Sequence, residues 1–204
     1  MIVNRKAISI LAAYIGLIYA TLPFGPKLFA FLSKSAGPSL KAYVNAGSIA
    51  LVISLIASFY PGVKRKRLSH FFGFAFILLI YALLITAYTP IIAEKVHLLE
   101  YGLLAYIASR VFKDTASRGK MGQSHSARNR HFWDSPYFSS LAVIVAVGYC
   151  DELIQGFLPN RVYELRDVYL NVLSGLLGLA LLRLLSGKNG AVPIFPVPPR
   201  PPRP

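Results

Sequence analysis

The sequence predicts an all-α fold: a polytopic membrane helical bundle of about six transmembrane helices, with the N- and C-termini in the cytoplasm. Two observations lead to this prediction. First, 55% of the 204 residues are hydrophobic and only 15% are charged, whereas about 25% are charged in an ordinary soluble domain. Second, the intervals 7–26, 42–63 and 68–93 contain no charged residue. Each interval is long enough for the helix of about 20 residues that crosses a hydrocarbon core.

The first expected helix follows a short basic start, Met1 to Lys6, that resembles a signal peptide. Because further hydrophobic segments follow and no small-residue cleavage site is evident, we expect an uncleaved membrane anchor. The last uncharged intervals are shorter than a full span, so the last three helices must carry charged residues into the membrane. We expect the six helices near residues 7–24, 42–60, 71–92, 94–112, 137–157 and 168–186.

Basic residues indicate how the chain is oriented in the membrane. The 22 lysines and arginines outnumber the 8 aspartates and glutamates and give a net charge of +14. If the N-terminus is cytoplasmic, sixteen of the 22 basic residues fall on the cytoplasmic side, as the positive-inside rule requires. These residues stand in short clusters between uncharged stretches, so we expect no nucleic acid partner. The single cysteine, Cys150, excludes a disulfide framework within the chain.

The chain divides into three expected regions. Residues 1–93 form an N-terminal three-helix membrane region without a recognisable motif. Residues 94–186 form a second three-helix region, interrupted by a basic cytoplasmic loop at 113–136. Residues 187–204 are expected to be a disordered tail, because this short stretch contains seven of the chain's 14 prolines.

Polar residues are concentrated near the outer ends of the last three expected helices. At about 1.5 Å per residue, Glu100 and Asp151 lie roughly 9 Å from the outer ends of their helices, and Asn171 about 6 Å. An ionisable side chain at a helix centre costs about 2.5–3.5 kcal/mol on insertion, so these groups must face the bundle interior. We expect one outward-facing intramembrane polar pocket, lined by Glu94, His97, Glu100, Tyr101, Asp151, Glu152, Gln155, Arg161, Arg166, Asp167 and Asn171.

Two interpretations of these residues remain open. They form either a functional site or a polar clasp, because Asn, Gln and His side chains also hold membrane helices together. Ser174, Gly175 and Gly178 are assigned to packing, since small residues let helix backbones approach closely. Tyr14 and Tyr19 are expected near a membrane interface, where amphipathic rings are common.

Two sequence motifs resemble a known family. The motif EKVHLLEYGLL at 94–104 is followed by DELIQGFLPNR at 151–161, then LRDV at 165–168 and Asn171. In this order they resemble the two signatures of VanZ-like membrane proteins, over about residues 94–183. Many relatives carry His where this chain has Ile154 and Gly where it has Asn160. The expected helix 137–157 therefore lacks the histidine that a mechanism with a second histidine would need.

The resemblance implies a multi-pass protein of the bacterial cytoplasmic (inner) membrane. The founding member of the family is associated with low-level teicoplanin resistance. Some relatives accompany systems that export or sort surface proteins and polymers. The partners implied are membrane lipids and a lipid-linked or cell-wall ligand, while the cofactor and the oligomeric state stay open.

The first functional hypothesis is a non-enzymatic protein that binds a cell-envelope headgroup or precursor. Arg161 and Arg166 would hold its phosphate or carboxylate, because guanidinium groups form paired hydrogen bonds with both. Asp167 would orient an arginine, and Gln155 and Asn171 would supply neutral hydrogen bonds.

The alternative is an intramembrane hydrolase or transferase that acts on a lipid-linked substrate. His97 would be the general base, with Glu100 or Glu152 as its partner and Arg161 as the stabiliser of negative charge. In a metal-dependent form, His97 and Glu100 would share a divalent ion with Asp151 or Glu152. Proton-coupled transport is a third hypothesis, which is disfavoured because the polar layer reaches only half of the way across the membrane.

Overall fold

The structure is a computed structural model that describes residues 5–37, 39–40, 42–47, 50, 68–88, 92–119, 135–159 and 161–185. Every regular element in these ranges is a helix, which confirms the all-α class for this part of the chain. The elements are α1 (Arg5–Thr21), α2 (Gly25–Ala36), α4 (Leu68–Leu83), a π-helical turn η1 (Leu84–Tyr88), α5 (Ile92–Gly119), α6 (Pro136–Phe157) and α7 (Leu165–Leu185).

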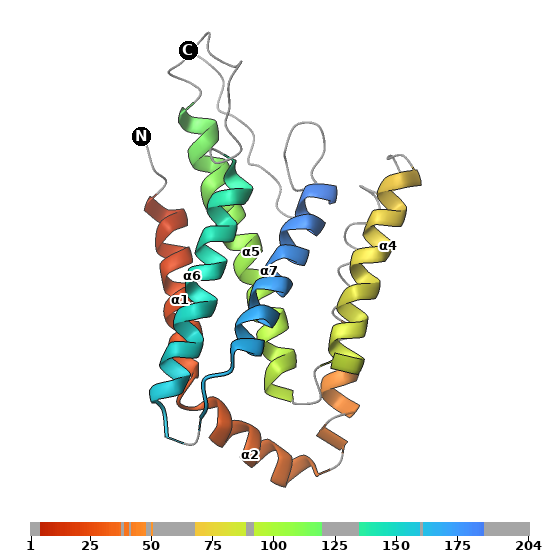
Figure 1. Ribbon diagram of the computed structural model, residues 1–204, viewed down its shortest axis with the longest axis vertical. Helices are drawn as coiled ribbons and strands as arrows, with labels where there is room; N and C mark the ends of the chain where they lie inside the picture. The colour runs from red at the N-terminus through yellow and green to blue at the C-terminus, as the bar shows by residue number, and fades with distance from the viewer. Residues whose placement is uncertain are drawn as a thin grey trace, which may run out of the picture.

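The long helices run roughly parallel or antiparallel to one another in a bundle (Figure 1). Helix α5 packs against α1, α6 and α7, and α4 packs against α7. Helix α2 lies across one end of the bundle instead of along it (Figure 1). Helices α5 and α7 begin at this end and α6 ends there (Figure 1). The ends of these helices therefore lie at the same end of the bundle.

Local sequence explains where several helices begin and end. Pro136 starts α6 directly after the extended Ser135, and proline suits the first helical turn because that turn leaves its N–H groups unpaired. Gly37 ends α2 with a positive φ of 56°, a conformation that glycine adopts without strain. Asp167 in the first turn of α7 and Arg183 in its last turn both complement the helix dipole.

Small residues bring the helices of the core together. A Cβ atom at Gly178 of α7 would lie 3.1 Å from Ala105 Cβ and 3.2 Å from the Gly102 carbonyl oxygen of α5. At Gly175, a Cβ atom would lie 2.5 Å from Ile144 of α6. Ser174 is fully buried and bonds to the Leu98 carbonyl oxygen of α5. These three residues thus have the packing positions that their small size predicts.

Two helices in the described ranges, α6 and α7, are long and apolar enough to cross a membrane. Helices α1 and α2 would make a third span only if this pair, bent by 62°, formed one crossing. The apolar stretch Phe71–Thr86 is shorter, and α5 has 28 residues but carries charges along its length. Within the described residues, the structure thus supports two or three candidate spans, not clearly the six that the sequence predicts. The interval 7–26 ends in the first residues of α2, and the interval 68–93 is divided among α4, η1 and the start of α5. Most of the interval 42–63 lies outside the described residues.

Other expected boundaries also change. Helix α5 continues to Gly119, so the first part of the expected loop 113–136 is helical, because no glycine or proline interrupts the chain from 103 to 118. Pro136 already belongs to α6. Helix α2 replaces part of an expected exterior loop. Most of the expected helix 42–60, the loop residues 120–134 and the tail 187–204 lie outside the described residues.

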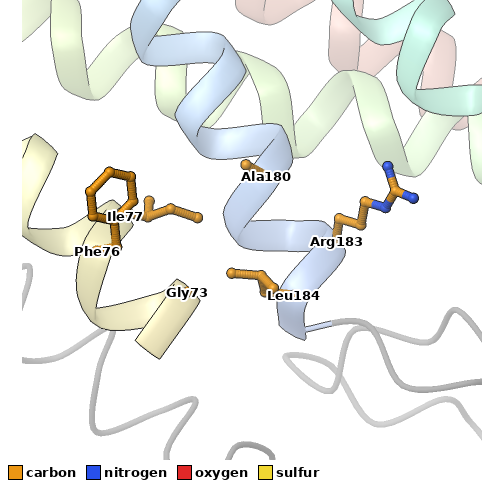
Figure 2. Close-up of a pocket in the computed structure, with 6 residues that line it drawn as sticks. All are labelled: Gly73, Phe76, Ile77, Ala180, Arg183 and Leu184. Atoms are coloured by element: carbon orange, nitrogen blue, oxygen red, sulfur yellow. The ribbon is translucent and has the colours of Figure 1, made fainter. Parts of the chain in front are cut away.

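A groove of about 420 Å³ lies between α4 and α7, near the first turns of α4 and the last turn of α7 (Figure 2). The Arg183 guanidinium points away from α4 (Figure 2), so the side chains that face each other across the groove are apolar. None of the residues predicted to form the polar pocket lines it. Its lining residues are Gly73, Phe76, Ile77, Ala180, Arg183 and Leu184.

Candidate functional site

The structure brings most of the predicted polar residues together at the end of the bundle that α2 crosses (Figure 1). They come from the first turns of α5, the last turns of α6, the segment 161–164 and the first turn of α7. We call the connected group the polar cluster; its members are Glu94, His97, Glu100, Tyr101, Asp151, Glu152, Gln155, Glu164, Arg166 and Asp167.

Asp151 lies at the centre of the polar cluster. Its side chain is 0% exposed, as is Tyr101. The Tyr101 hydroxyl donates a hydrogen bond of 2.9 Å to Asp151 Oδ2, and Gln155 Nε2 donates one of 3.2 Å to Oδ1. A buried carboxylate is costly unless such donors satisfy it. The bond from Tyr101 therefore ties α5 to α6 within the core.

His97 lies between two carboxylates. Its Nδ1 atom is 3.2 Å from Glu100 Oε2 and 3.7 Å from Asp151 Oδ2. His97 and Glu100 are three residues apart on α5, a spacing that places side chains on the same face of a helix. Their side chains are 15% and 24% exposed, so they form an accessible edge of the cluster beside the buried Asp151.

Glu152 connects the end of α6 to the segment before α7. Its Oε1 atom accepts a hydrogen bond of 2.9 Å from Gln155 Nε2, and its Oε2 atom accepts one of 3.3 Å from the Glu164 backbone N–H. The Gln155 amide thus donates to both neighbouring carboxylates. Glu152 is only 1% exposed, so these buried hydrogen bonds hold the end of α6 against the segment before α7.

Arg166 connects the first turn of α7 to the first turn of α5. It pairs with Glu94, whose side chain is buried. Its Nε atom also donates a hydrogen bond of 3.3 Å to Asp167 and lies 3.9 Å from Glu164 Oε2. Asp167 therefore contacts an arginine, as the sequence suggests, and the Arg166 guanidinium is engaged by several carboxylates of the protein itself.

Arg161 and Asn171 belong to the predicted pocket, but each has a buried donor atom without a hydrogen-bond acceptor among the described residues. Arg161 Nε and Asn171 Nδ2 have no hydrogen-bond partner among the described residues. Asn171 is 2% exposed. Arg161 Nη2 lies 3.7 Å from the point that a Cβ atom on Gly25 would occupy, so this guanidinium sits against the first turn of α2.

Gly148 lets the three helices of the cluster approach one another. A Cβ atom at this position of α6 would lie 3.2 Å from Asn171 Cβ on α7 and 3.3 Å from Tyr101 Cε1 on α5. Both distances are shorter than ordinary van der Waals contacts. Gly148 was not predicted from the sequence to belong to the site. Its place three residues before Asp151, on the same face of α6, is the signal that indicates it.

Helix α1 supports the cluster, a role that was not predicted from the sequence. Tyr14 and Tyr19 were expected near a membrane interface. In the structure their hydroxyls donate hydrogen bonds of 3.1 Å to the Glu100 carbonyl oxygen and 3.2 Å to the Val147 carbonyl oxygen. Tyr14 lies on the same face of α1 as the buried Ile18, a periodicity visible in the sequence. Helix α1 thus holds α5 and α6 in place next to the polar cluster, although it contributes no residue to the cluster.

Lys95 is a further polar residue that was not predicted to belong to the site. It is 2% exposed, and its Nζ donates a hydrogen bond of 2.7 Å to Asn45 Oδ1. The only sign of this role in the sequence is that Lys95 lies between Glu94 and His97. This bond connects the start of α5 to the helical segment at 42–47.

The accessible edge formed by His97 and Glu100 can carry out acid–base chemistry or hydrogen bonding. An imidazole beside a carboxylate can accept, hold or return a proton, with the carboxylate fixing its orientation. Among the residues that the structure describes, no group of three or more His, Cys, Asp or Glu side chains is arranged to hold a metal ion. The metal-dependent form of the enzyme hypothesis therefore finds no ligand set in this part of the chain.

Comparison with known proteins identifies the family. The sequence profile of the VanZ/LLP1 family matches residues 5–186. The match therefore includes α1, α2 and α4, and extends well beyond the two motifs at 94–104 and 151–161. Searches of curated proteins and of solved structures give no match. Because the family profile covers most of the chain, this membrane protein belongs to the VanZ/LLP1 family.

Proposed function

We propose that the polar cluster binds the polar headgroup of a cell-envelope lipid or of a lipid-linked cell-wall precursor. In this proposal the protein is a multi-pass protein of the bacterial cytoplasmic membrane, both chain ends are cytoplasmic and the cluster faces outward. The observation that carries the proposal is the His97–Glu100 pair, 3.2 Å apart at the accessible edge of an otherwise buried network.

The buried and accessible parts of the cluster have different roles in this proposal. Asp151 and Glu152 of α6 are almost completely buried and accept hydrogen bonds from Tyr101 of α5 and from the Glu164 backbone N–H before α7, so they hold these elements together as a polar clasp. His97 and Glu100 keep exposed surface. A ligand would meet these two side chains first, while the clasp fixes their positions.

The charges of the site favour a ligand with both an anionic and a hydrogen-bonding part. Arg166 is engaged by Glu94 and Asp167. The buried Nε of Arg161 has no partner among the described residues, so we assign the phosphate of the ligand to Arg161. Glu100 and His97 would then hold hydroxyl or ammonium groups of the same headgroup.

Mass spectrometry of the lipids and metabolites that co-purify with the protein tests this proposal. The comparison uses wild type and His97→Ala, both extracted directly into nanodiscs from their native membrane. We expect one headgroup class to be enriched with the wild type and to fall on the order of tenfold with His97→Ala, equivalent to about 1.4 kcal/mol. Thr115→Ala is the matched control, because Thr115 lies on the same helix far from the cluster. Identical profiles for all three proteins would contradict the proposal.

An intramembrane hydrolase or transferase is the second candidate function. The observation that favours it is that His97 Nδ1 lies near two carboxylates, at 3.2 Å from Glu100 and 3.7 Å from Asp151. Such an arrangement suits a general base, because one carboxylate orients the imidazole and both stabilise its protonated form. The substrate would be lipid-linked, and Arg161 would stabilise negative charge that develops during the reaction.

Glu100→Gln separates binding from catalysis. The purified wild type and the variant are incubated with a lipid extract of the native membrane, and products are followed by mass spectrometry. A catalyst would convert a lipid with the wild type, whereas the variant would retain that lipid but convert it more slowly. A binding protein would return every lipid unchanged in both samples.

Membership of the VanZ/LLP1 family also leads us to propose a link to glycopeptide (teicoplanin) resistance or to the export of surface polymers or proteins. A deletion strain complemented with wild type or His97→Ala tests this link. The expected result is that only the wild type restores teicoplanin tolerance or surface-polymer content. Full complementation by His97→Ala would separate the phenotype from the polar cluster.

A further inference from the structure

Helix α2 has no part in the proposed function, yet it lies across the end of the bundle that carries the polar cluster (Figure 1). It makes an angle of 62° with α1. Its 12 residues cover about 18 Å, which is too short to cross a hydrocarbon core of about 30 Å. A helix with this length and direction lies along a membrane surface more readily than through it.

The partly buried residues of α2 define the side that faces the protein. Gly25, Leu32 and Ala36 are each partly buried, and at about 100° per residue they share one face of the helix. Lys27 and Lys34 are seven residues apart and lie on roughly the opposite face, where both are exposed. The two lysines therefore point away from the bundle.

A third side of α2 is apolar and exposed. Phe24, Leu28 and Phe31 follow one another at helical spacing and are 67%, 54% and 66% exposed. This stripe lies between the face that contacts the protein and the face that carries the lysines. At the same end of the bundle, Phe157 and Val162 are 88% and 75% exposed. Large apolar side chains are therefore uncovered on two neighbouring segments.

We propose that α2 is an interfacial helix that lies in the headgroup layer of the membrane and binds anionic phospholipids. Phe24, Leu28 and Phe31 insert among the acyl chains beside the bundle. Lys27 and Lys34 pair with lipid phosphates, because a basic edge next to an apolar stripe is the pattern that interfacial helices use. The occupant of this surface is thus a lipid layer and not a protein partner.

This position fixes the depth of the cluster, independently of what the cluster binds. Arg161 lies against Gly25 at the start of α2, so a helix held in the headgroup layer keeps Arg161 at the same level. Membrane-spanning helices alone leave the tilt and height of a bundle adjustable. An interfacial helix at one end restricts both.

Fluorescence quenching in vesicles tests the depth of α2. The full chain carries Trp133→Phe, which removes its single tryptophan, together with Phe31→Trp or, on the lysine side, Ala30→Trp. Both positions are exposed, so both variants are expected to fold. The vesicles contain phosphatidylcholine and phosphatidylglycerol at 3:1 by design, with bromine at carbons 6,7 or 11,12 of the acyl chains.

We expect the tryptophan at position 31 to be quenched more by the 6,7-brominated lipid than by the 11,12-brominated lipid. The tryptophan at position 30 should be quenched mainly by aqueous acrylamide. Stronger quenching of position 31 by the deeper bromines would instead indicate a re-entrant segment. Quenching of both positions by acrylamide alone would mean that α2 does not touch the bilayer. Either of these last two results would overturn the proposal.

The lipid preference is tested separately with charge variants. Native mass spectrometry measures the ratio of retained phosphatidylglycerol to phosphatidylcholine after extraction from 1:1 vesicles. The double variant Lys27→Gln/Lys34→Gln should lose at least half of the enrichment for phosphatidylglycerol. The matched variant Lys27→Arg/Lys34→Arg should retain it, because it keeps both charges. Equal ratios for all three proteins would show that the lysines do not bind lipid phosphate.

Discussion

Asp151 of α6 joins this helix to α5, because its carboxylate receives hydrogen bonds from Tyr101 and Gln155 and lies beside His97. A buried acceptor that loses its donor costs about 1–3 kcal/mol. The stability of the bundle and the geometry of the His97–Glu100 edge therefore depend on the same few atoms. A change at Tyr101 or Gln155 should affect both.

Tyr101→Phe removes one hydroxyl and leaves the buried ring in place. We expect it to lower the free energy of unfolding by about 1.5–3 kcal/mol, the range for a hydrogen bond to a charged group. Denaturant titration in detergent micelles measures the loss. Tyr106→Phe is the matched control on the same helix, because its ring packs against an apolar cluster that contains Phe74 and Leu182. If both variants lose the same stability, the hydroxyl of Tyr101 has no special role.

Arg161→Gln tests the residue assigned to the ligand phosphate. Arg161 makes no ion pair within the described ranges and its buried Nε has no partner there. Because Arg161→Gln therefore removes no described polar interaction, we expect a change of less than about 0.5 kcal/mol in unfolding free energy. Retention of the co-purifying headgroup should fall on the order of tenfold. Arg161→Lys should retain part of it, because the charge remains but the paired geometry is lost. A variant that unfolds readily would show that the guanidinium is structural.

At the scale of helices, the close contact between α5 and α7 determines how the cluster is assembled. Gly178 faces Gly102 and Ala105 across this contact, and Ser174 one turn earlier bonds to the α5 backbone. Tyr81 of α4 donates a hydrogen bond of 2.7 Å to the Ser174 carbonyl oxygen, which brings a third helix to the same place. The first turns of α5 and α7 can approach each other because Gly178 and Gly102, which have no side chains, lie at the nearby contact between the two helices.

Gly178→Ala and Gly16→Ala make the same chemical change in two different environments. At Gly178 the new methyl group would lie 3.2 Å from a backbone carbonyl oxygen, so we expect a loss of about 1–3 kcal/mol from overpacking. At Gly16 of α1, nothing lies within 4 Å of the added atom. There we expect a gain of about 0.5–1 kcal/mol from higher helix propensity. Thermal unfolding of both purified variants should give shifts of opposite sign, and shifts of the same sign would contradict the packing explanation.

At the scale of the whole molecule, the two ends of the bundle differ. Helices α1 and α4 begin and α7 ends at one end, whereas the polar cluster and α2 occupy the other (Figure 1). The apolar groove between α4 and α7 lies at the end without the cluster (Figure 2). A proposal in which the cluster faces outward therefore also places the start of α6 on the cytoplasmic side.

Cysteine labelling of intact cells tests this orientation. In a Cys150→Ala background, which removes the only native cysteine, single cysteines replace Val162 at the cluster end or Ser135 at the start of α6. A membrane-impermeant maleimide should label the Val162→Cys protein in intact cells, because Val162 is 75% exposed. The Ser135→Cys protein should be labelled only after lysis. The reverse pattern would place the cluster in the cytoplasm.

The sequence alone predicted the composition of the cluster well for a physical reason. Each residue of an α-helix adds a fixed rise, so counting residues from the end of a helix gives the depth of a side chain in the membrane. Because a charged side chain facing lipid is costly, charged and polar side chains at equal depth on neighbouring helices are expected to contact one another. The contact of Asp151 with Tyr101 and His97 follows from these two rules. Their pairing geometry does not, because side-chain rotamers depend on the neighbouring helices.

The expectations that failed concern segments where charge and hydropathy are weak guides. Residues 25–36 contain two lysines and were expected as a loop, but they form α2, because a helix needs only one apolar side when it lies against a bundle. Helix α5 extends past the last hydrophobic residue, because neither glycine nor proline interrupts residues 103–118 and charged side chains are compatible with a helix. The place of Tyr14 near a membrane interface stays a prediction, whereas its hydrogen bond to α5 was not predicted, because it depends on tertiary packing.

The order of the helices has a consequence for biogenesis. Tyr101 on α5 precedes its partner Asp151 by 50 residues, and Glu94 precedes Arg166 by 72. At about 5–20 residues per second of translation, a nascent α5 waits roughly 4–14 s for the arginine of α7. During that time its ionisable side chains must be sheltered by the insertion machinery or by water. A ribosome that stalls before α7 thus leaves a chain that quality-control proteases can distinguish from the finished protein.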